Sequence, residues 1–153
     1  MNSIGIAEKA GYNLPPVAPA SGVYEPLKLF GEKLAYLSGT GPNIEGEETF
    51  VGKLGNELTI DDGKRAARFT ALNCLSVLDN MVGLANIKKI VKVLAFIASE
   101  REFIYQPEIA NEASKIFIDV LGEDVGKAAR SAIGVEVLPG NIPIEIEMLV
   151  ELK

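Results

Sequence analysis

The sequence predicts an α+β fold in which two long helices cover one face of a mixed β-sheet. Residues 59–82 and 107–121 place apolar side chains at the helical period, and apolar runs with strand character lie before, between and after them. The expected order is β-β-(β)-α-β-α-β-β, which is typical of helices packed on one layer of strands. With 153 residues and no internal repeat, the chain is expected to form one domain.

The N-terminal region is expected to contain a short helix followed by a hairpin. Residues 2–10 form the expected amphipathic helix, and Leu14-Pro15-Pro16 predicts an extended segment because residues before proline avoid helical angles. Residues 23–30 and 33–40 have the composition of strands. Gly31-Glu32 between them is a glycine-first pair, which is typical of a tight hairpin turn.

Both long helices carry start and stop signals. Thr59 is an expected N-cap with Asp62 three residues later, as in a capping box, and Gly83 ends the first helix. Pro107 suits the first turn of the second helix, which should end at Gly122. The apolar stripes that should face the sheet are Ala67, Ala71, Cys74, Leu75, Leu78 and Met81 in the first helix, and Ile109, Ala113, Ile116, Phe117, Val120 and Leu121 in the second.

Residues 87–98 predict a central strand that is covered on both faces. Apart from their lysines they are nearly continuous in Ile, Val, Leu and Phe. The two helices can cover one face, and a single domain of this size offers nothing for the other. Because the chain is also 48% hydrophobic, which is rich for a monomer, we expect a partner subunit to provide that cover.

The C-terminal residues hold the best candidates for chemistry. A strand that starts at Arg130 is followed by the turn Pro139-Gly140-Asn141 and by an alternating segment, residues 142–152. A β-hairpin across this turn would place Arg130 beside Glu145, and a guanidinium can bind a carboxylate with two hydrogen bonds. From the residues alone, Arg130 could equally form a structural or surface ion pair. The other acidic side chains of the last strand are expected on a solvated face: Glu147 and Glu151.

Composition excludes several classes of protein. The chain has no histidine, which removes the usual general base, the Ser-His and Cys-His pairs and imidazole-bound zinc. Its single cysteine, Cys74, excludes an intrachain disulfide and a multi-cysteine metal site, and is expected to be buried and inert. A net charge of -6 argues against a nucleic-acid partner. Because we find neither a membrane-length apolar segment nor a secretory N-terminus, we expect a cytoplasmic protein without membrane contact.

Several motifs together resemble a known family. Arg130-Ser131, Leu138-Pro139 and then Ile144-Glu145-Ile146-Glu147 follow, without a gap, the C-terminal signature of the reactive intermediate deaminase family, also called RidA/YjgF/endoribonuclease L-PSP. Gly22-Val23-Tyr24 resembles the Gly-Pro-Tyr element of that family, and Tyr36-Leu37-Ser38-Gly39 resembles its apolar-Ser-Gly strand end. The C-terminal signature is the specific part of the match.

The resemblance implies a chorismate-mutase-like (YjgF-like) fold, a homotrimer packed through the sheets, and clefts at the subunit interfaces. Deaminase members of the family hydrolyse enamines and imines, such as 2-iminobutanoate and 2-iminopropanoate, to 2-oxo acids and ammonia, without a metal or organic cofactor. By this similarity Arg130 binds the substrate carboxylate, while Glu145 and the backbone around Ala132 position the attacking water. The other substrate-binding residues that the resemblance implies are Tyr24, Ser38 and Asn111.

The chain resembles a longer branch of the family and departs from its pattern at a few positions. Residues 1–16 are interpreted as an N-terminal extension and residues 43–56 as an extended loop, with a short strand near Phe50, within a single domain spanning 1–153. Val23 replaces the usual proline, and Ala132 stands where many members carry cysteine. We expect these two departures to reshape the pocket between them without changing its charge.

Three functions remain open from the sequence. The first is the hydrolysis of 2-imino acids by an enzyme of the family described above. The second is an endoribonuclease or translation-inhibitor role, which the family name carries and which acidic charge and the absence of histidine disfavour. The third is a non-catalytic trimer that binds a small carboxylate, for which Arg130 would serve equally well.

Overall fold

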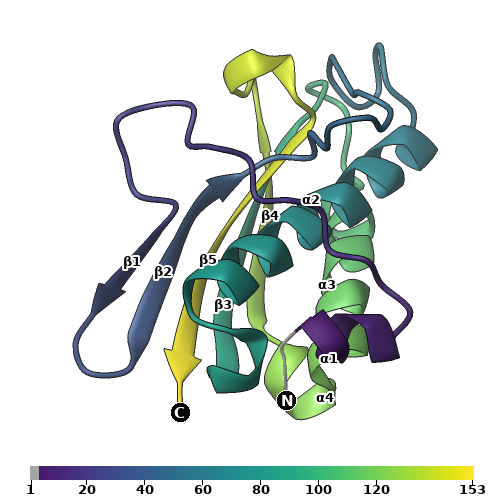
Figure 1. Cartoon of the computed structure of the whole chain (residues 1–153). Coiled ribbons are helices and arrows are strands. Elements are labelled where there is room, and N and C mark those ends of the chain that lie inside the picture. The colour runs from purple at the N-terminus through teal and green to yellow at the C-terminus, as the bar shows by residue number, and fades with distance from the viewer. Residues whose placement is uncertain (1–3) are drawn as a thin grey trace.

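A computed structural model describes residues 4–153 as one layer of helices on one five-stranded sheet (Figure 1). The strand order is β1-β2-β5-β3-β4, with β3 and β4 parallel and the other neighbours antiparallel. This mixed α+β architecture confirms the predicted fold class. Asn2 and Ser3 of the expected first helix lie outside the described residues, and the helix observed there, α1, spans Ile4–Lys9.

The hairpin near the N-terminus forms largely as predicted. Strands β1 (Leu27–Phe30) and β2 (Leu34–Thr40) pair around a turn at Gly31, which has a φ of 59°. β1 begins after Pro26, a residue that has no N–H for the sheet, rather than at the expected residue 23. The strand expected near Phe50 is absent; Phe50 is buried in a loop, and its ring packs edge-on against Phe69 at 5.7 Å between centroids.

The two long helices match their sequence signals. Helix α2 (Ile60–Met81) begins with the predicted capping box: the Thr59 hydroxyl accepts from the Asp62 N–H, and the Asp62 carboxylate accepts from the Thr59 N–H at 2.8 Å. Helix α3 (Gln106–Leu121) has Pro107 in its first turn and is followed by a short helix, α4 (Glu123–Gly126). Their predicted apolar stripes form the core against the sheet, apart from half-exposed Met81 and Leu121 at the ends.

The predicted C-terminal hairpin is wrong. Strand β4 (Ala129–Val135) pairs in parallel with β3 (Ile87–Ala98), and β5 (Ile144–Leu152) pairs with the opposite edge of β3. The chain enters β4 from α3, so β3, α3 and β4 form a crossover unit that needs a parallel neighbour. A loop containing a short 3-10 turn, Pro139–Asn141, then carries the chain past β3 to β5.

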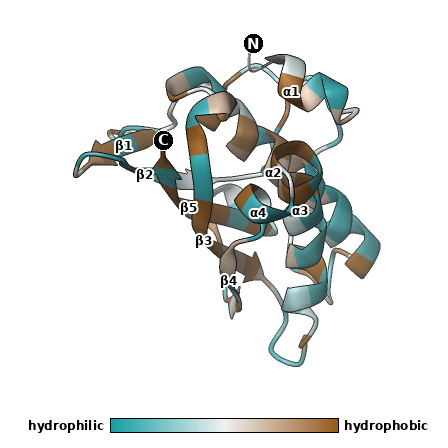
Figure 2. Ribbon diagram, turned by 90° about the horizontal axis from the view of Figure 1, so that it is seen from below, coloured by the Kyte–Doolittle hydropathy of each residue, from teal (hydrophilic) through white to brown (hydrophobic). Residues whose placement is uncertain are grey.

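The two faces of the sheet differ in their cover. The side chains of β3 and β5 that face α2 and α3 are buried, including Val93, Ile146 and Met148. In the described chain no helix covers the opposite face, as Figure 2 shows. The register places Tyr36, Phe96 and other apolar or partly exposed side chains there. We call this surface the open face.

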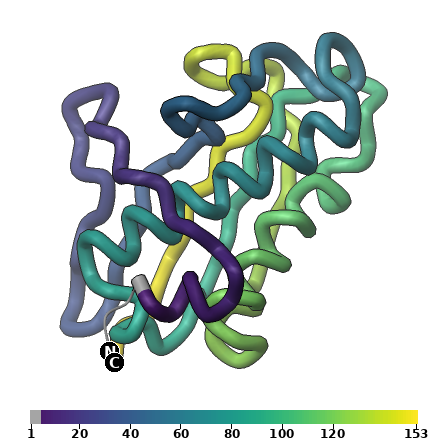
Figure 3. Tube along the Cα trace, turned by 45° about the vertical axis from the view of Figure 1, so that its right-hand side comes forward, coloured from purple at the N-terminus to yellow at the C-terminus, as the bar shows by residue number. Residues whose placement is uncertain are grey.

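The segment between α1 and β1 crosses the outside of the helix layer. Figure 3 shows it running from α1 across α2 toward the β1–β2 hairpin. The Tyr12 hydroxyl donates to the Asp119 carboxylate of α3 at 2.7 Å, and Leu14 and Val17 pack against the core. We refer to residues 12–26 as the strap, and it brings its last residues to the site described next.

Candidate functional site

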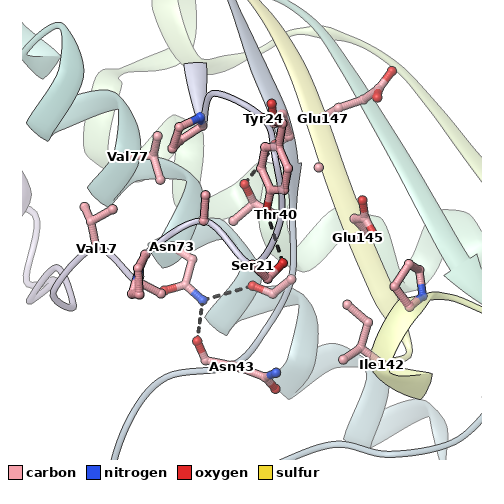
Figure 4. Close-up of a pocket in the computed structure, with 18 of the residues that line it drawn as sticks. Val17, Ser21, Tyr24, Thr40, Asn43, Asn73, Val77, Ile142, Glu145 and Glu147 are labelled. Carbon is pink, nitrogen blue, oxygen red and sulfur yellow. Dashed lines mark hydrogen bonds between the residues drawn. The ribbon is translucent and has the colours of Figure 1, made fainter. Parts of the chain in front are cut away.

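One pocket in the part of the chain that the structure describes has a volume of about 770 Å³, and we call it the large pocket. Its walls come from the end of the strap, the end of β2, the start of β5, the loop before β5 and one face of α2. Figure 4 shows Glu145 and Glu147 on the β5 side, and Val17 and Val77 on the side of the strap and α2. The pocket therefore combines a carboxylate end and an apolar end.

The carboxylate end is formed by alternate residues of β5. Glu145 and Glu147 both lie on the open face, because Ile144, Ile146 and Met148 between and beside them point into the core. The Tyr36 hydroxyl of β2 donates to the Glu147 carboxylate at 2.8 Å. Desolvation raises the pKa of the Glu145 carboxyl above its ordinary value, and the nearby charge of Glu147 raises it further. The pKa of Glu145 therefore lies closer to neutral pH than that of an ordinary glutamate.

Gly39 provides the space that the Glu145 side chain occupies. A Cβ built at Gly39 would overlap the Glu145 carboxylate, so no other residue fits here without moving it. The register of β2 and β5 shifts between Leu37 and Thr40, which marks a bulge at this glycine. The Ser-Gly element noted in the sequence therefore has a steric reason in this chain.

Ser38 and Tyr24 line the pocket, as the resemblance implies, but Val23 does not. The Ser38 hydroxyl donates to the Glu25 carbonyl at 2.6 Å, and its backbone N–H donates to the Pro26 carbonyl, so it fixes the end of the strap. The Tyr24 and Ser21 hydroxyls lie 3.3 Å apart. Val23 is fully exposed and is not part of the pocket lining, which contradicts the expectation that it shapes the wall.

Arg130 lies elsewhere in the same chain. Its guanidinium donates to the Asn111 Oδ1 at 2.8 Å and to the Ser114 Oγ at 3.2 Å, both on α3. The register aligns Arg130 with Val93 on the helix side, whereas Glu145 aligns with Phe96 on the open face. Two strand spacings and three residues along the strand separate them by roughly 14 Å between Cα atoms. The expected side-by-side placement of Arg130 and Glu145 within one chain is therefore wrong, because β3 lies between their strands.

The edge strand β4 forms a second group of candidate residues with α3. Arg130 and Asn111 meet here, although the sequence suggested Asn111 only by its position in the helix. Within residues 4–153 no carboxylate forms a salt bridge with Arg130. Ala132, two residues along β4, is half-buried on the same face and does not line the large pocket. The guanidinium is thus held by neutral groups and retains its charge for another anion.

Sequence reasoning missed four parts of the pocket. The sequence predicts that Glu147 lies on a solvated face, and it marks Tyr36 only as part of the apolar-Ser-Gly motif. Asn73 of α2 donates from its Nδ2 to the carbonyls of Gly41 and Asn43, at 2.9 and 3.0 Å, and so holds the loop after β2. A polar residue between apolar helix positions was the available signal for Asn73. The strap residues 17–21 carry no periodic pattern that could have placed them at the pocket.

Within residues 4–153 no group of three or more His, Cys, Asp or Glu side chains is arranged to bind a metal ion. Burial raises the pKa of the Cys74 thiol to about 12, so this cysteine is unreactive, as its apolar surroundings predicted. No helix among those described is long and apolar enough to cross a membrane.

Known proteins resemble the chain in sequence and in structure. Residues 6–152 match the family described as "YjgF/chorismate mutase-like, putative endoribonuclease". Protein TCP17 of Trypanosoma cruzi is 36% identical over 147 residues, which are 95% of this chain and 91% of that protein. The crystal structure of Atu1372 from Agrobacterium tumefaciens, a protein of unknown function, has a TM-score of 0.87 at 33% identity and covers 99% of this chain and 92% of its own. E. coli TdcF with bound serine has a TM-score of 0.60 at 24% identity, over 91% and 94% of the two chains. The chain belongs to the YjgF/chorismate mutase-like family.

Proposed function

We propose that the chain is a hydrolytic deaminase that converts 2-imino acids to 2-oxo acids and ammonia in a cleft between two subunits. The observation that carries this proposal is the division of the charged groups. The large pocket contains two carboxylates and no lysine or arginine in its lining, whereas Arg130 lies on the edge strand with only neutral partners. Arg130 can bind the carboxylate of a small substrate, and the pocket carboxylates can position the water that hydrates it.

The open face supports an assembly that joins the two groups. It carries the aromatic side chains of Phe30, Tyr36 and Phe96, and Ile133 beside them is 43% exposed. Exposed apolar side chains on a sheet face that no helix covers are typical of a subunit interface. A homotrimer with the open faces at its centre would bury them and bring β4 of one subunit toward the pocket of the next.

In the proposed reaction Arg130 of one subunit binds the substrate carboxylate with two charge-assisted hydrogen bonds. Water held at Glu145 of the neighbouring subunit attacks C2 of the imine, forming a C–O bond as the C=N π electrons pass to nitrogen. Glu145 accepts a proton from the water and returns a proton to the nitrogen. In the resulting carbinolamine Glu145 takes the proton of the new hydroxyl and passes it to the nitrogen. The C2–N bond then breaks as the oxygen electrons form the C=O bond, so ammonia leaves and the 2-oxo acid remains.

The raised pKa of Glu145 suits this exchange of protons. A group that must both accept and donate a proton works best when its pKa lies near the operating pH. The imine carbon is already electrophilic, so orientation and charge stabilisation matter more than a strong base. This is consistent with a chain that contains no histidine. Serine, the ligand of TdcF, is a small amino acid whose carboxylate resembles that of the proposed substrate.

The direct test generates 2-imino acids in situ from amino acids with an amino-acid oxidase and catalase. Semicarbazide competes for the imine, so a deaminase lowers the yield of the trapped product. We expect wild-type protein to lower it at catalytic concentration, and the Arg130→Ala variant to have no effect. A wild-type protein that binds 2-oxo acids without altering the trapped yield would instead be a non-catalytic carboxylate-binding trimer.

The family description also favours an endoribonuclease as a second candidate. The net charge of -6 and the absence of histidine weigh against it, since RNA binding needs cationic surface and RNA cleavage needs an acid and a base. Cleavage of RNA by thoroughly purified wild-type protein, and its loss in the Arg130→Ala and Glu145→Gln variants, would support this candidate over the deaminase.

A further inference from the structure

The apolar end of the large pocket has no role in the reaction proposed above. It is formed by the strap together with one residue of α2 and one of the loop before β5. In Figure 4, Val17 and Val77 lie on the far side of Thr40 from Glu145. The apolar lining residues at issue are Val17, Ala18, Pro19, Ala20, Val77 and Ile142.

The size of the pocket exceeds what the smallest substrates of this class require. An imine derived from alanine has about six heavy atoms, which fill at most roughly 180 Å³ even at the ~30 Å³ that a water molecule occupies in the liquid. Within a single chain, before a neighbouring subunit is added, the pocket of about 770 Å³ is several times larger. It lies within the range of roughly 300 to 1,000 Å³ that is typical of pockets for larger organic ligands.

Two glycines in the pocket wall leave room for the side chains of Glu145 and Ile142. Gly39 and Gly41 both line the pocket beside Thr40. A Cβ at Gly41 would come within 2.7 Å of the Ile142 Cδ1, and one at Gly39 would overlap Glu145. Thr40 lies between these glycines, and the pocket includes residues on both sides of it, so a ligand can extend from the carboxylate end past the Thr40 side chain toward the strap.

The strap is fixed at both ends, so its apolar wall is a permanent part of the pocket. Tyr12 donates to Asp119 at 2.7 Å near its beginning, and the Ser38 hydroxyl holds the Glu25 carbonyl at its end. Val17 packs against the hydrophobic core, while Ala18, Pro19 and Ala20 remain exposed. Exposed apolar residues on an anchored segment are available to a ligand at little cost in conformational entropy.

We propose that this wall selects 2-imino acids with large apolar side chains, such as those formed from leucine, methionine or phenylalanine, over those formed from alanine. This inference rests on the proposed deaminase activity. The substrate carboxylate and imine lie at the carboxylate end, and the side chain extends past Thr40 to the strap. Ala18 and Ala20 are the positions where added bulk would shorten the apolar end without entering the core.

The test measures kcat/KM with the full-length protein for imines generated from alanine, leucine and phenylalanine. We expect the larger two to exceed the alanine-derived imine by about tenfold or more, the discrimination typical of an apolar pocket that recognises extra methylenes. Ala20→Phe should lower kcat/KM for the larger imines by about tenfold and leave that for the alanine-derived imine within about threefold. Asn13→Phe is the matched control, because Asn13 is an exposed strap residue outside the pocket lining.

A second readout separates this inference from the proposed reaction. Binding of the products, pyruvate and 4-methyl-2-oxopentanoate, is measured by calorimetry for the same variants. If no imine is hydrolysed but the larger oxo acid binds more tightly and Ala20→Phe removes the difference, the deaminase proposal fails and the size selection stands. The size selection would be overturned if the smallest ligands were turned over and bound as well as the larger ones, or better. That outcome would also require that Ala20→Phe and Asn13→Phe have the same effect. This conclusion would hold whatever the reaction is.

Discussion

Gly39 lies so close to Glu145 that a β-carbon on the glycine would occupy the position of the carboxylate. The first prediction follows from this contact. Gly39→Ala should displace the Glu145 side chain and lower kcat by about 10² to 10⁴, the typical contribution of a positioned acid or base. Steady-state kinetics with in situ imines measure the loss, and circular dichroism checks that the fold is retained.

Gly5→Ala provides the control for this substitution. A Cβ at Gly5 meets no atom within 4 Å, so the helix around it should accept alanine and the activity should stay at the wild-type value. Full activity in the folded Gly39→Ala protein would show that the position of Glu145 does not limit the reaction.

The charge of Glu147 should set the pH dependence of the reaction. Titratable side chains that face Glu145 in the pocket are Tyr24, Tyr36 and Glu147, and the negative charge of Glu147 raises the pKa of Glu145. Glu147→Gln removes that charge and therefore lowers the pKa. Because the reaction begins with Glu145 as a carboxylate, the acidic limb of the kcat/KM profile should move to lower pH.

Tyr36→Phe is the matched comparison for the pH experiment. It deletes the hydrogen bond to Glu147 at 2.8 Å but keeps the carboxylate charge, so the acidic limb should move less than in Glu147→Gln. Equal shifts in both variants would mean that packing around the pair, rather than its charge, controls the titration of Glu145.

The ionised Glu145 carboxylate should lower the free energy of unfolding at neutral pH. Desolvation raises its pKa in the folded state above the unfolded value, so the folded state is penalised once the carboxyl ionises. Glu145→Gln should therefore have a higher Tm than wild type at pH 7. The difference should shrink as the pH falls below the ordinary pKa of glutamate, about 4.3, because the carboxyl is then protonated in both states. A Tm difference that is constant with pH would assign the effect to packing.

Arg130 and Glu145 should complement each other between subunits. Arg130→Ala should lose on the order of 2 to 5 kcal/mol of 2-oxo acid binding, measured by calorimetry, and Arg130→Lys should recover little because lysine cannot form the bidentate contact. Co-expressed Arg130→Ala and Glu145→Gln chains should regain about a quarter of wild-type activity, since one interface in about four pairs the two intact residues. No recovery in verified mixed trimers would contradict a site that Arg130 and Glu145 share across the interface.

The assembly itself can be measured directly. Light scattering at micromolar concentration should give a mass three times that of the 16.4 kDa chain, because a trimer buries the open face. Tyr36→Lys, which puts a charge on that face, should weaken the trimer, whereas Lys115→Ala on the outer surface of α3 should not. A monomer at this concentration would contradict both the trimer and the shared cleft.

The sequence was sufficient where local chemistry decides the structure. The Thr59 and Asp62 capping box and the apolar stripes of α2 and α3 depend on residues a few positions apart, so their patterns predicted them. The partner of β4 depends instead on competition between strands. β3 is long enough to bind a neighbour on each edge, and the crossover through α3 delivers β4 in parallel before the chain reaches β5.

The residues of the candidate site also differ in how well local sequence could predict them. Tyr24, Ser38 and Glu145 come together because the strap end, β2 and β5 are neighbours in space, and motifs marked all three residues. Tyr36 and Glu147 were harder to assign, since an alternating strand gives no sign of which exposed side chains will form a hydrogen bond. The apolar strap residues 17–20 could not be placed, because their position depends on the anchoring bond between Tyr12 and Asp119.

The position of β3 between Arg130 and Glu145 also has a consequence for how the protein would behave at low concentration. A single chain would hold both groups yet be unable to bring them to one substrate, so catalysis would depend on association by mass action. Specific activity should then fall on dilution toward the dissociation constant of the trimer, and ligand should restore it by favouring the assembled form. The amount of protein in the cell, and not only the amount of substrate, would determine whether the reaction runs.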